Sequence, residues 1–158
     1  MRYQRARNFC IGITALALLA VTSWALADQR SPEDIISGRR SNLRDLGSAF
    51  KELGEELKKK KPMEFMVQQY VAQIGDLAQQ EQNWFPAGTG QKTGIETHAK
   101  DEIWARPEDF SKAMQAFQRE AGVLTGIAAS DADALKAQHR KLGVTCKGCH
   151  DTFREKED

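Results

Sequence analysis

One short motif, Cys146-Lys147-Gly148-Cys149-His150, constrains the fold of this chain more than any other part of the sequence. Two cysteines three positions apart on a helix project from nearly the same face, so both thiols can reach one planar group. The histidine that follows lies on that face as well, and its imidazole can bind iron. Cys-x-x-Cys-His is the attachment motif of c-type haem. The motif therefore predicts one covalent haem c, with thioethers at Cys146 and Cys149 and with His150 as an iron ligand.

Two other kinds of site use paired cysteines at this spacing, a redox site of the thioredoxin type and half of a zinc site. The redox site is expected beside a strand–helix–strand pattern, and the zinc site requires two more ligands at metal spacing. The sequence has neither pattern. The third cysteine, Cys10, lies in a predicted leader. Cys146 and Cys149 are therefore left with the same use and with no further thiol as a disulfide partner.

The start of the chain has the pattern of a secretory signal peptide. An apolar run over 9–24 follows a basic segment, and the small residues of 25–27 form a cleavage signal. The apolar run is short for a membrane-spanning helix, which needs about 20 residues, and no stop-transfer pattern follows, which argues against a retained anchor. We predict that 1–27 is removed, that 28–158 forms the mature domain, and that the protein is exported to the periplasm.

The charge of the mature chain argues against two classes of partner. The sequence has 23 basic and 22 acidic residues, and without the leader arginines at positions 2, 5 and 7 the basic count falls to 20, a net charge of −2. This near-balance argues against nucleic acid or an anionic membrane surface as a partner. The one strong basic run, 58–61, follows glutamates one helical turn earlier, which is typical of a solvated helix end.

Apolar residues recur at helical spacing in four segments of the mature chain, and no segment has a convincing strand pattern. The first helix is predicted to begin at Ser31 and Pro32, which supply a capping hydroxyl and a proline for the first turn. Pro62 ends this helix, and a second apolar stripe predicts another helix over 62–84.

A loop rich in glycine and proline, 85–98, separates these two helices from the rest, and a short apolar turn around Ile103 follows. Pro107 begins the third helix. Ser130 and Asp133 resemble a capping box with Asp in place of Glu, and the fourth helix runs from there through the haem motif. Four amphipathic helices with mostly short links predict an all-α fold, an antiparallel up-down-up-down four-helix bundle with the haem near the C-terminus.

Several segments besides the haem motif match the sequence pattern of one protein family. They are Pro32-Glu33-Asp34 followed by Arg39 to Leu43, the loop from Phe85 to Gly90, the turn Glu102-Ile103-Trp104, and the last helix from Gly143 to Arg154. Together they resemble the cytochrome c′ family, the class II c-type cytochromes. The resemblance covers essentially all of the mature chain.

The resemblance implies roles for individual residues. It implies thioethers at Cys146 and Cys149 and a proximal iron ligand at His150. Arg154, four residues later on the same helix face, would flank the proximal histidine, although a solvated arginine is equally compatible with the spacing. Arg39 would lie near the haem propionates as a charge partner, although a surface arginine fits the spacing nearly as well.

The residue at the sixth coordination position divides class II cytochromes by function. A methionine there gives a low-spin electron carrier, whereas Leu43 has no donor atom. The resemblance therefore implies five-coordinate, high-spin iron with an apolar distal pocket that admits small uncharged diatomic gases such as NO or CO. The alternative is a six-coordinate, low-spin electron carrier with its sixth ligand from Met63, Met66 or His98, or from Met114, although a methionine at helical spacing is more often core filler.

His139 departs from the family pattern, which has a bulky apolar or aromatic residue there. It precedes His150 by three helical turns, so a packed or propionate-bonded histidine is expected rather than a distal ligand. No catalytic triad or phosphate loop is present, so no enzyme activity is predicted. The expected partners are a periplasmic redox protein and a diatomic gas; a haem sensor or subunit of a larger complex is a third hypothesis. The resemblance also implies a homodimer packed through the first two helices.

Overall fold

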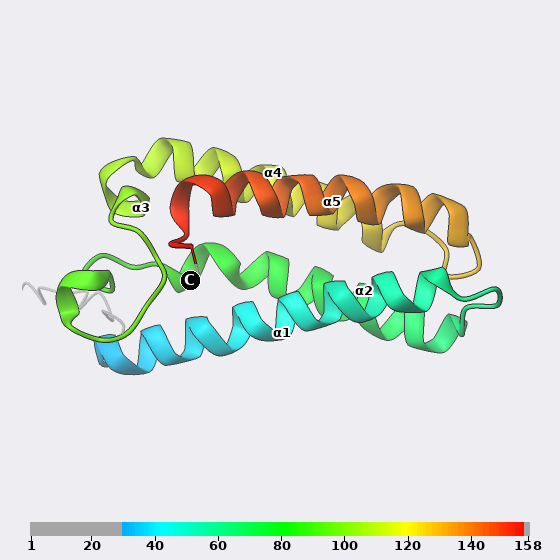
Figure 1. Cartoon of the computed structure of the whole chain (residues 1–158), viewed down its shortest axis with the longest axis horizontal. Coiled ribbons are helices and arrows are strands. Elements are labelled where there is room, and N and C mark those ends of the chain that lie inside the picture. Colours follow the sequence, from blue (N-terminus) through cyan, green and yellow to red (C-terminus); the bar gives the residue numbers. More distant parts are fainter. Residues whose placement is uncertain (1–29, 157–158) are drawn as a thin grey trace, which may run out of the picture.

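The computed structural model describes residues 30–156, so the predicted leader over 1–27 lies outside the described residues. Four long helices form an antiparallel bundle (Figure 1): α1 (Pro32–Lys58), α2 (Glu64–Gln80), α4 (Pro107–Thr125) and α5 (Ala132–Phe153). The predicted all-α four-helix bundle is confirmed. Across 30–156 there is no strand, only one isolated bridge between Ala99 and Arg154. Within the same range, no helix is long and apolar enough to cross a membrane.

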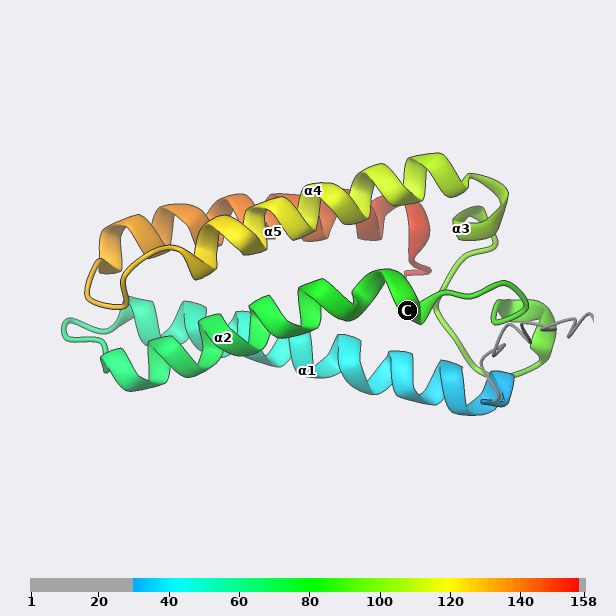
Figure 2. The ribbon, with the colours of Figure 1, turned by 180° about the vertical axis from the view of Figure 1, so that it is seen from behind.

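The bundle has two layers. α1 packs against α2 in one layer and α4 packs against α5 in the other, while α2 also contacts α4 and α1 contacts α5. Figure 2 shows the same two layers from behind. The long connection between α2 and α4 lies at one end of the bundle and contains three short elements: η1 (Glu81–Trp84), η2 (Gln91–Thr93) and α3 (Glu102–Ala105). Gly88 and Gly94 in this connection have positive φ angles of 81° and 73°, which glycine adopts without strain.

The start of α1 follows the predicted signals. The Ser31 hydroxyl accepts a hydrogen bond from the Asp34 backbone N–H at 3.1 Å, and the Asp34 carboxylate accepts from the Ser31 N–H at 3.3 Å. At the other end, buried Glu56 accepts a hydrogen bond from the Met63 N–H at 2.8 Å. This bond ties the last turn of α1 to the residue that precedes α2, and therefore fixes the short turn between the two helices.

The predicted start of the last helix was wrong by one residue. Asp131, not Ser130, is the N-cap of α5, because its carboxylate accepts a hydrogen bond from the Ala134 N–H at 3.0 Å. A hydrogen bond of 2.9 Å from the Asp131 N–H to the Ala128 carbonyl closes a turn just before the helix. The helix therefore begins one position later than a box built on Ser130 requires, and an aspartate is as good a cap as a serine.

The apolar core occupies the part of the bundle toward the α1–α2 turn. Its fully buried members come from all four long helices and include Leu53, Ile74, Leu124, Leu135 and Leu142. The cluster ends toward the long connection, where α5 also ends, and at that end the four helices surround a cavity instead of a solid core.

Candidate functional site

The cavity at this end of the bundle has a volume of about 660 Å³, within the range of pockets that hold cofactor-sized ligands. α1, α4, α5 and the connection after α2 all contribute side chains to its wall. The structure brings every residue of the predicted site to this one cavity, although they lie at the two ends of the mature chain: Arg39, Leu43, Cys146, Cys149, His150 and Arg154.

α5 supplies two thiols and an imidazole to the wall. Cys146, Cys149 and His150 lie within its last two turns and line the cavity together. Burial, with a smaller contribution from the charge of Glu81, raises the pKa of the Cys146 thiol to about 11 and that of Cys149 to about 12. A redox-active Cys-x-x-Cys site instead needs a lowered thiol pKa. Across 30–156 no three His, Cys, Asp or Glu side chains are grouped so that they could hold a metal ion.

Aromatic rings form the part of the wall beside these cysteines. Phe110 of α4 packs edge-on against Phe85 and Phe153, with ring centroids 5.0 Å and 5.2 Å apart. All three rings line the cavity, and Cys149 packs against the same cluster. Such edge-to-face pairs contribute about 1 kcal/mol each beyond the area that they bury. The wall next to the thiols is thus apolar and suited to a large flat group.

α1 contributes Leu43 to the wall, one turn after Arg39 on the same helix face. Leu43 is half-buried and lines the cavity, whereas Arg39 is buried, with 2% of its surface exposed. Burial lowers the pKa of the Arg39 guanidinium to about 10, so it stays charged at neutral pH.

Arg39 holds the long connection against α1. Its guanidinium donates to the Thr89 hydroxyl at 3.0 Å, to the Thr89 carbonyl at 2.9 Å and to the Thr97 hydroxyl at 2.9 Å, with a longer bond of 3.4 Å to the Trp84 carbonyl. It also lies 4.9 Å from the Phe85 ring centroid, over its face. These partners are neutral, and across 30–156 no carboxylate forms a hydrogen bond with Arg39. Among the described residues, the charge is therefore buried without a counter-ion.

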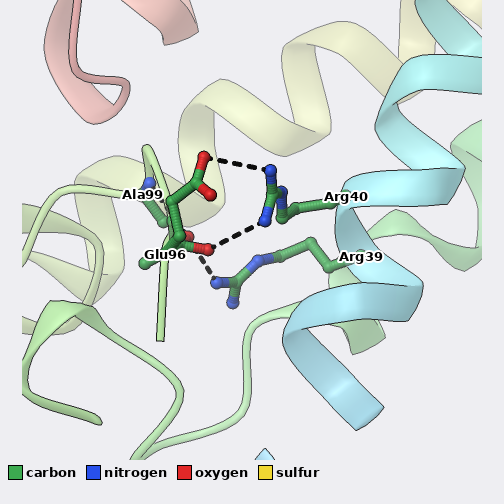
Figure 3. Close-up of polar contacts among 5 residues, drawn as sticks. Arg39, Arg40, Glu96 and Ala99 are labelled. Atoms are coloured by element: carbon green, nitrogen blue, oxygen red, sulfur yellow. Dashed lines mark hydrogen bonds and ion pairs between the residues drawn. The ribbon is translucent and has the colours of Figure 1, made fainter. Parts of the chain in front are cut away.

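A second set of contacts closes the connection over the end of α5. Arg40 binds the Glu96 carboxylate at 3.1 Å and the Glu96 carbonyl at 3.3 Å (Figure 3). Beyond Glu96, the backbone of 98–100 pairs with the end of α5: the Lys100 N–H donates to the Phe153 carbonyl at 3.0 Å, and the Glu155 N–H donates to the His98 carbonyl at 2.8 Å. Arg154 is exposed within this bridge and lines the edge of the cavity.

The other candidate sixth ligands divide into two groups. Met63 precedes α2 at the far end of the bundle and is 56% exposed, and Met66 follows in the first turn of α2; neither lines the cavity. His98 and buried Met114 do line it. The geometry therefore argues against Met63 and Met66 as sixth ligands and leaves His98 and Met114 as the alternatives.

His139 has the packed role expected for it. Its ring stacks on Phe50 of α1, with centroids 3.9 Å apart and planes 11° from parallel, and its Nε2 lies 2.9 Å from the Phe50 carbonyl oxygen. Gly54 makes this approach possible, because a Cβ there would lie 3.0 Å from the histidine Cε1. His139 does not line the cavity itself, but it supports Phe50, which does.

Sequence reasoning missed Glu81 of η1, an ionisable member of the cavity wall. It is 8% exposed, and its Oε2 atom has no hydrogen-bond partner among the described residues. The sequence carries no signal for it, because a glutamate at the end of a helix stripe is usually solvated.

A four-helix bundle whose last helix presents Cys-x-x-Cys-His to an apolar cavity defines a class, the four-helix c-type cytochromes. The sequence profile described as Cytochrome C′ matches residues 34–154. The chain therefore belongs to the cytochrome c′ family, and it carries covalent haem c. The resemblance drawn from the sequence is confirmed.

Relatives of known name agree in both sequence and fold. The chain is 34% identical over 127 residues to cytochrome c′ of Rhodopseudomonas palustris, covering 78% of this chain and 84% of the relative. The solved nitric oxide complex of a mutant cytochrome c prime from Alcaligenes xylosoxidans is similar with a TM-score of 0.71 and 29% identity, covering 80% and 98% of the two chains. A cytochrome c′ with unusual ligand-controlled dimer dissociation is similar with a TM-score of 0.74 and 25% identity, covering 80% and 98%.

Proposed function

We propose that this protein is a periplasmic mono-haem cytochrome with five-coordinate, high-spin iron, which exchanges single electrons and binds small uncharged gases such as NO and CO. The observation that carries the proposal is Leu43, a side chain without a donor atom, which lines the same cavity as His150. Bound haem supplies a one-electron couple and an iron site that is open to a small ligand.

The residues of the cavity fit this group. Cys146 and Cys149 are free thiols on one wall and would form the two thioethers, with His150 beside them as the iron ligand. The Phe85, Phe110 and Phe153 rings give an apolar surface for a porphyrin. The uncompensated charge of Arg39 suits a propionate, because a buried cation is stabilised by a charged acceptor.

Leu43 would select the ligand by exclusion. An apolar side chain offers no hydrogen bond to water or to a polar anion, so a polar ligand would lose its hydration without compensation. A neutral diatomic molecule loses little hydration on entry. The nitric oxide complex of a related protein supports this choice of gas.

The absorption spectrum of the reduced protein, with and without NO, tests the proposal. We expect broad high-spin bands that change when NO is added. Leu43→Met should give the sharp pair of visible bands of a low-spin, six-coordinate haem, whereas Leu53→Met, a buried core substitution outside the cavity, should not. Sharp low-spin bands in the unsubstituted protein would refute the five-coordinate site.

The competing function is a low-spin electron carrier, and the presence of His98 and Met114 on the cavity wall is the observation that favours it. Thioether sulfur and imidazole both bind haem iron. His98→Gln and Met114→Leu test this directly. If neither substitution changes the spectrum or the reduction potential, the alternative is removed.

Three further parts of the proposal concern export and assembly. We expect the exported protein to begin at Asp28, which its intact mass would show.

A homodimer is supported by the ligand-controlled dimer of a relative, and by Phe65 of α2, which is 67% exposed. Light scattering of the protein and of Phe65→Ser would test that contact. The physiological redox partner would be a periplasmic protein that donates or accepts one electron.

A further inference from the structure

Glu81 is an ionisable side chain in the haem cavity that none of the preceding roles uses. It begins η1, directly after α2, in the layer opposite α5. The cavity-lining residues nearest to it in the sequence are Ile74 of α2 and Phe85 of the connection, both apolar. The carboxyl group therefore lines the same cavity as the thiols of α5, and its charge acts on both of them.

This carboxyl group is buried without compensation. Only 8% of the residue is exposed, and Oε2 has no hydrogen-bond partner among residues 30–156. Burial alone raises the pKa of Glu81 to about 7, because the charged form loses its hydration and gains no partner. A carboxyl group with such a pKa gains or loses its proton near neutral pH, whereas an exposed glutamate is fully ionised there.

The other charged groups on the cavity wall do not neutralise Glu81. From α1 they are Arg39, which binds the connection, Arg40, which binds Glu96, and the exposed Arg44 and Lys51. The connection contributes His98, and α5 contributes the two thiols, His150 and Arg154. The α4 part of the wall is apolar: Phe110, Ala113, Met114 and Phe117.

We propose that Glu81 is a proton-binding site of the haem cavity, which takes up one proton when the protein accepts an electron. This inference rests on the proposed one-electron function. Reduction removes one positive charge from the cavity, so the carboxylate loses an attraction that had favoured its ionised form. The balanced change is one electron from a one-electron donor and one proton from water, with the Glu81 carboxylate becoming a neutral carboxylic acid.

The linkage has a defined sign. Below the pKa of Glu81 in both redox states the group stays protonated, and the reduction potential does not depend on it. Between the pKa of the oxidised state and the higher pKa of the reduced state, the potential falls as pH rises, by up to about 59 mV per pH unit, since each unit changes the equilibrium tenfold. Above both pKa values the carboxylate is ionised in both redox states, so the reduction potential is again independent of pH, at a lower value.

The test is a redox titration of the haem-loaded protein between about pH 5 and pH 9, with Glu81→Gln as the main variant. Glutamine has the size of a protonated glutamate and cannot ionise. We expect the variant to match the unsubstituted protein at the acid end, to have the higher potential at the alkaline end, and to lack the slope near neutral pH. Glu52→Gln, which replaces an exposed carboxylate next to cavity-lining Lys51, should keep the slope.

A second measurement detects the added proton directly in the unsubstituted protein. The infrared difference spectrum between reduced and oxidised protein should contain the C=O stretch of a newly protonated carboxyl group, and this band should be absent from Glu81→Gln and from Glu81→Leu. Equal slopes in Glu81→Gln and the unsubstituted protein, or no carboxyl band in the unsubstituted protein, would overturn the inference. Absence of any reversible one-electron couple would instead refute the proposed function.

Discussion

Replacing Arg39 with lysine keeps one positive charge in a buried place but removes the planar guanidinium. In the structure that group reaches Thr89 and Thr97 at the same time, through bonds of 2.9 to 3.0 Å from two different nitrogens. A lysine ammonium is a compact charge that cannot span the same acceptors. Arg39→Lys therefore separates two possible roles of this residue, holding the connection in place and supplying a charge.

The expected cost follows from the hydrogen bonds that are lost. At least two of the four bonds to Trp84, Thr89 and Thr97 should disappear. A bond from a charged donor contributes about 1.5 kcal/mol or more to stability, so the free energy of unfolding should fall by about 3 kcal/mol. The interaction with the Phe85 ring, 4.9 Å away, is weakened as well, because lysine stacks less well than arginine.

Urea unfolding of the haem-loaded protein, followed by helical circular dichroism, measures this loss. Arg44→Lys is the matched control, because Arg44 is an exposed arginine on the same helix, and its change should stay within about 0.5 kcal/mol. A cycle with Thr97→Val should give a coupling energy above about 0.5 kcal/mol between the two sites. If Arg39→Lys is as stable as the unsubstituted protein, the guanidinium does not hold the connection and the reasoning is refuted.

Three smaller predictions concern other residues. Asp131→Ala should cost about 1 kcal/mol in urea unfolding and Ser130→Ala less than about 0.5, because only the aspartate caps α5. His139→Ala should lower stability by about 2 kcal/mol in thermal unfolding, through loss of the stacked ring and of the hydrogen bond to Phe50. The stability advantage of Glu81→Gln should grow from about pH 4.5 to about pH 7 and reach about 3 kcal/mol in the haem-free protein, because a raised acid pKa destabilises the folded state as pH rises; a pH-independent difference would contradict this.

The parts of the site that sequence could predict depend on contacts within one helix. The spacing of Cys146, Cys149 and His150 places them together on any helix, and the same is true of Arg39 and Leu43. Apolar periodicity was sufficient for the bundle, because the stripes of the four helices have few other ways to be buried. The prediction that both sets of residues face one cavity required the resemblance to a family, since the two helices lie about a hundred residues apart in the chain.

The parts that sequence could not predict depend on contacts between segments. Asp131 and Ser130 are both good caps, and a turn with Ala128 decided between them. The partners of Arg39 come from an irregular connection whose path no periodicity describes. Glu81 is the clearest case, because burial is set by the packing of η1 against α1 and α4 and not by its neighbours in sequence.

Arg39 and Glu81 are buried residues of opposite charge on the cavity wall, and a bound haem would explain why both charges are there. Both are buried, they have opposite charges, and they do not form an ion pair with each other. Two such charges would be costly in an empty apolar space, where pairing is the usual solution. A haem changes the balance, because it has negative propionates at one edge and a positive iron at its centre. Arg39 would suit a propionate and Glu81 would suit the positive iron, so each charge would have a counterpart in the bound cofactor. Reduction would weaken the attraction that favours the ionised form of Glu81, so proton uptake is expected there, whereas Arg39 is already protonated at neutral pH.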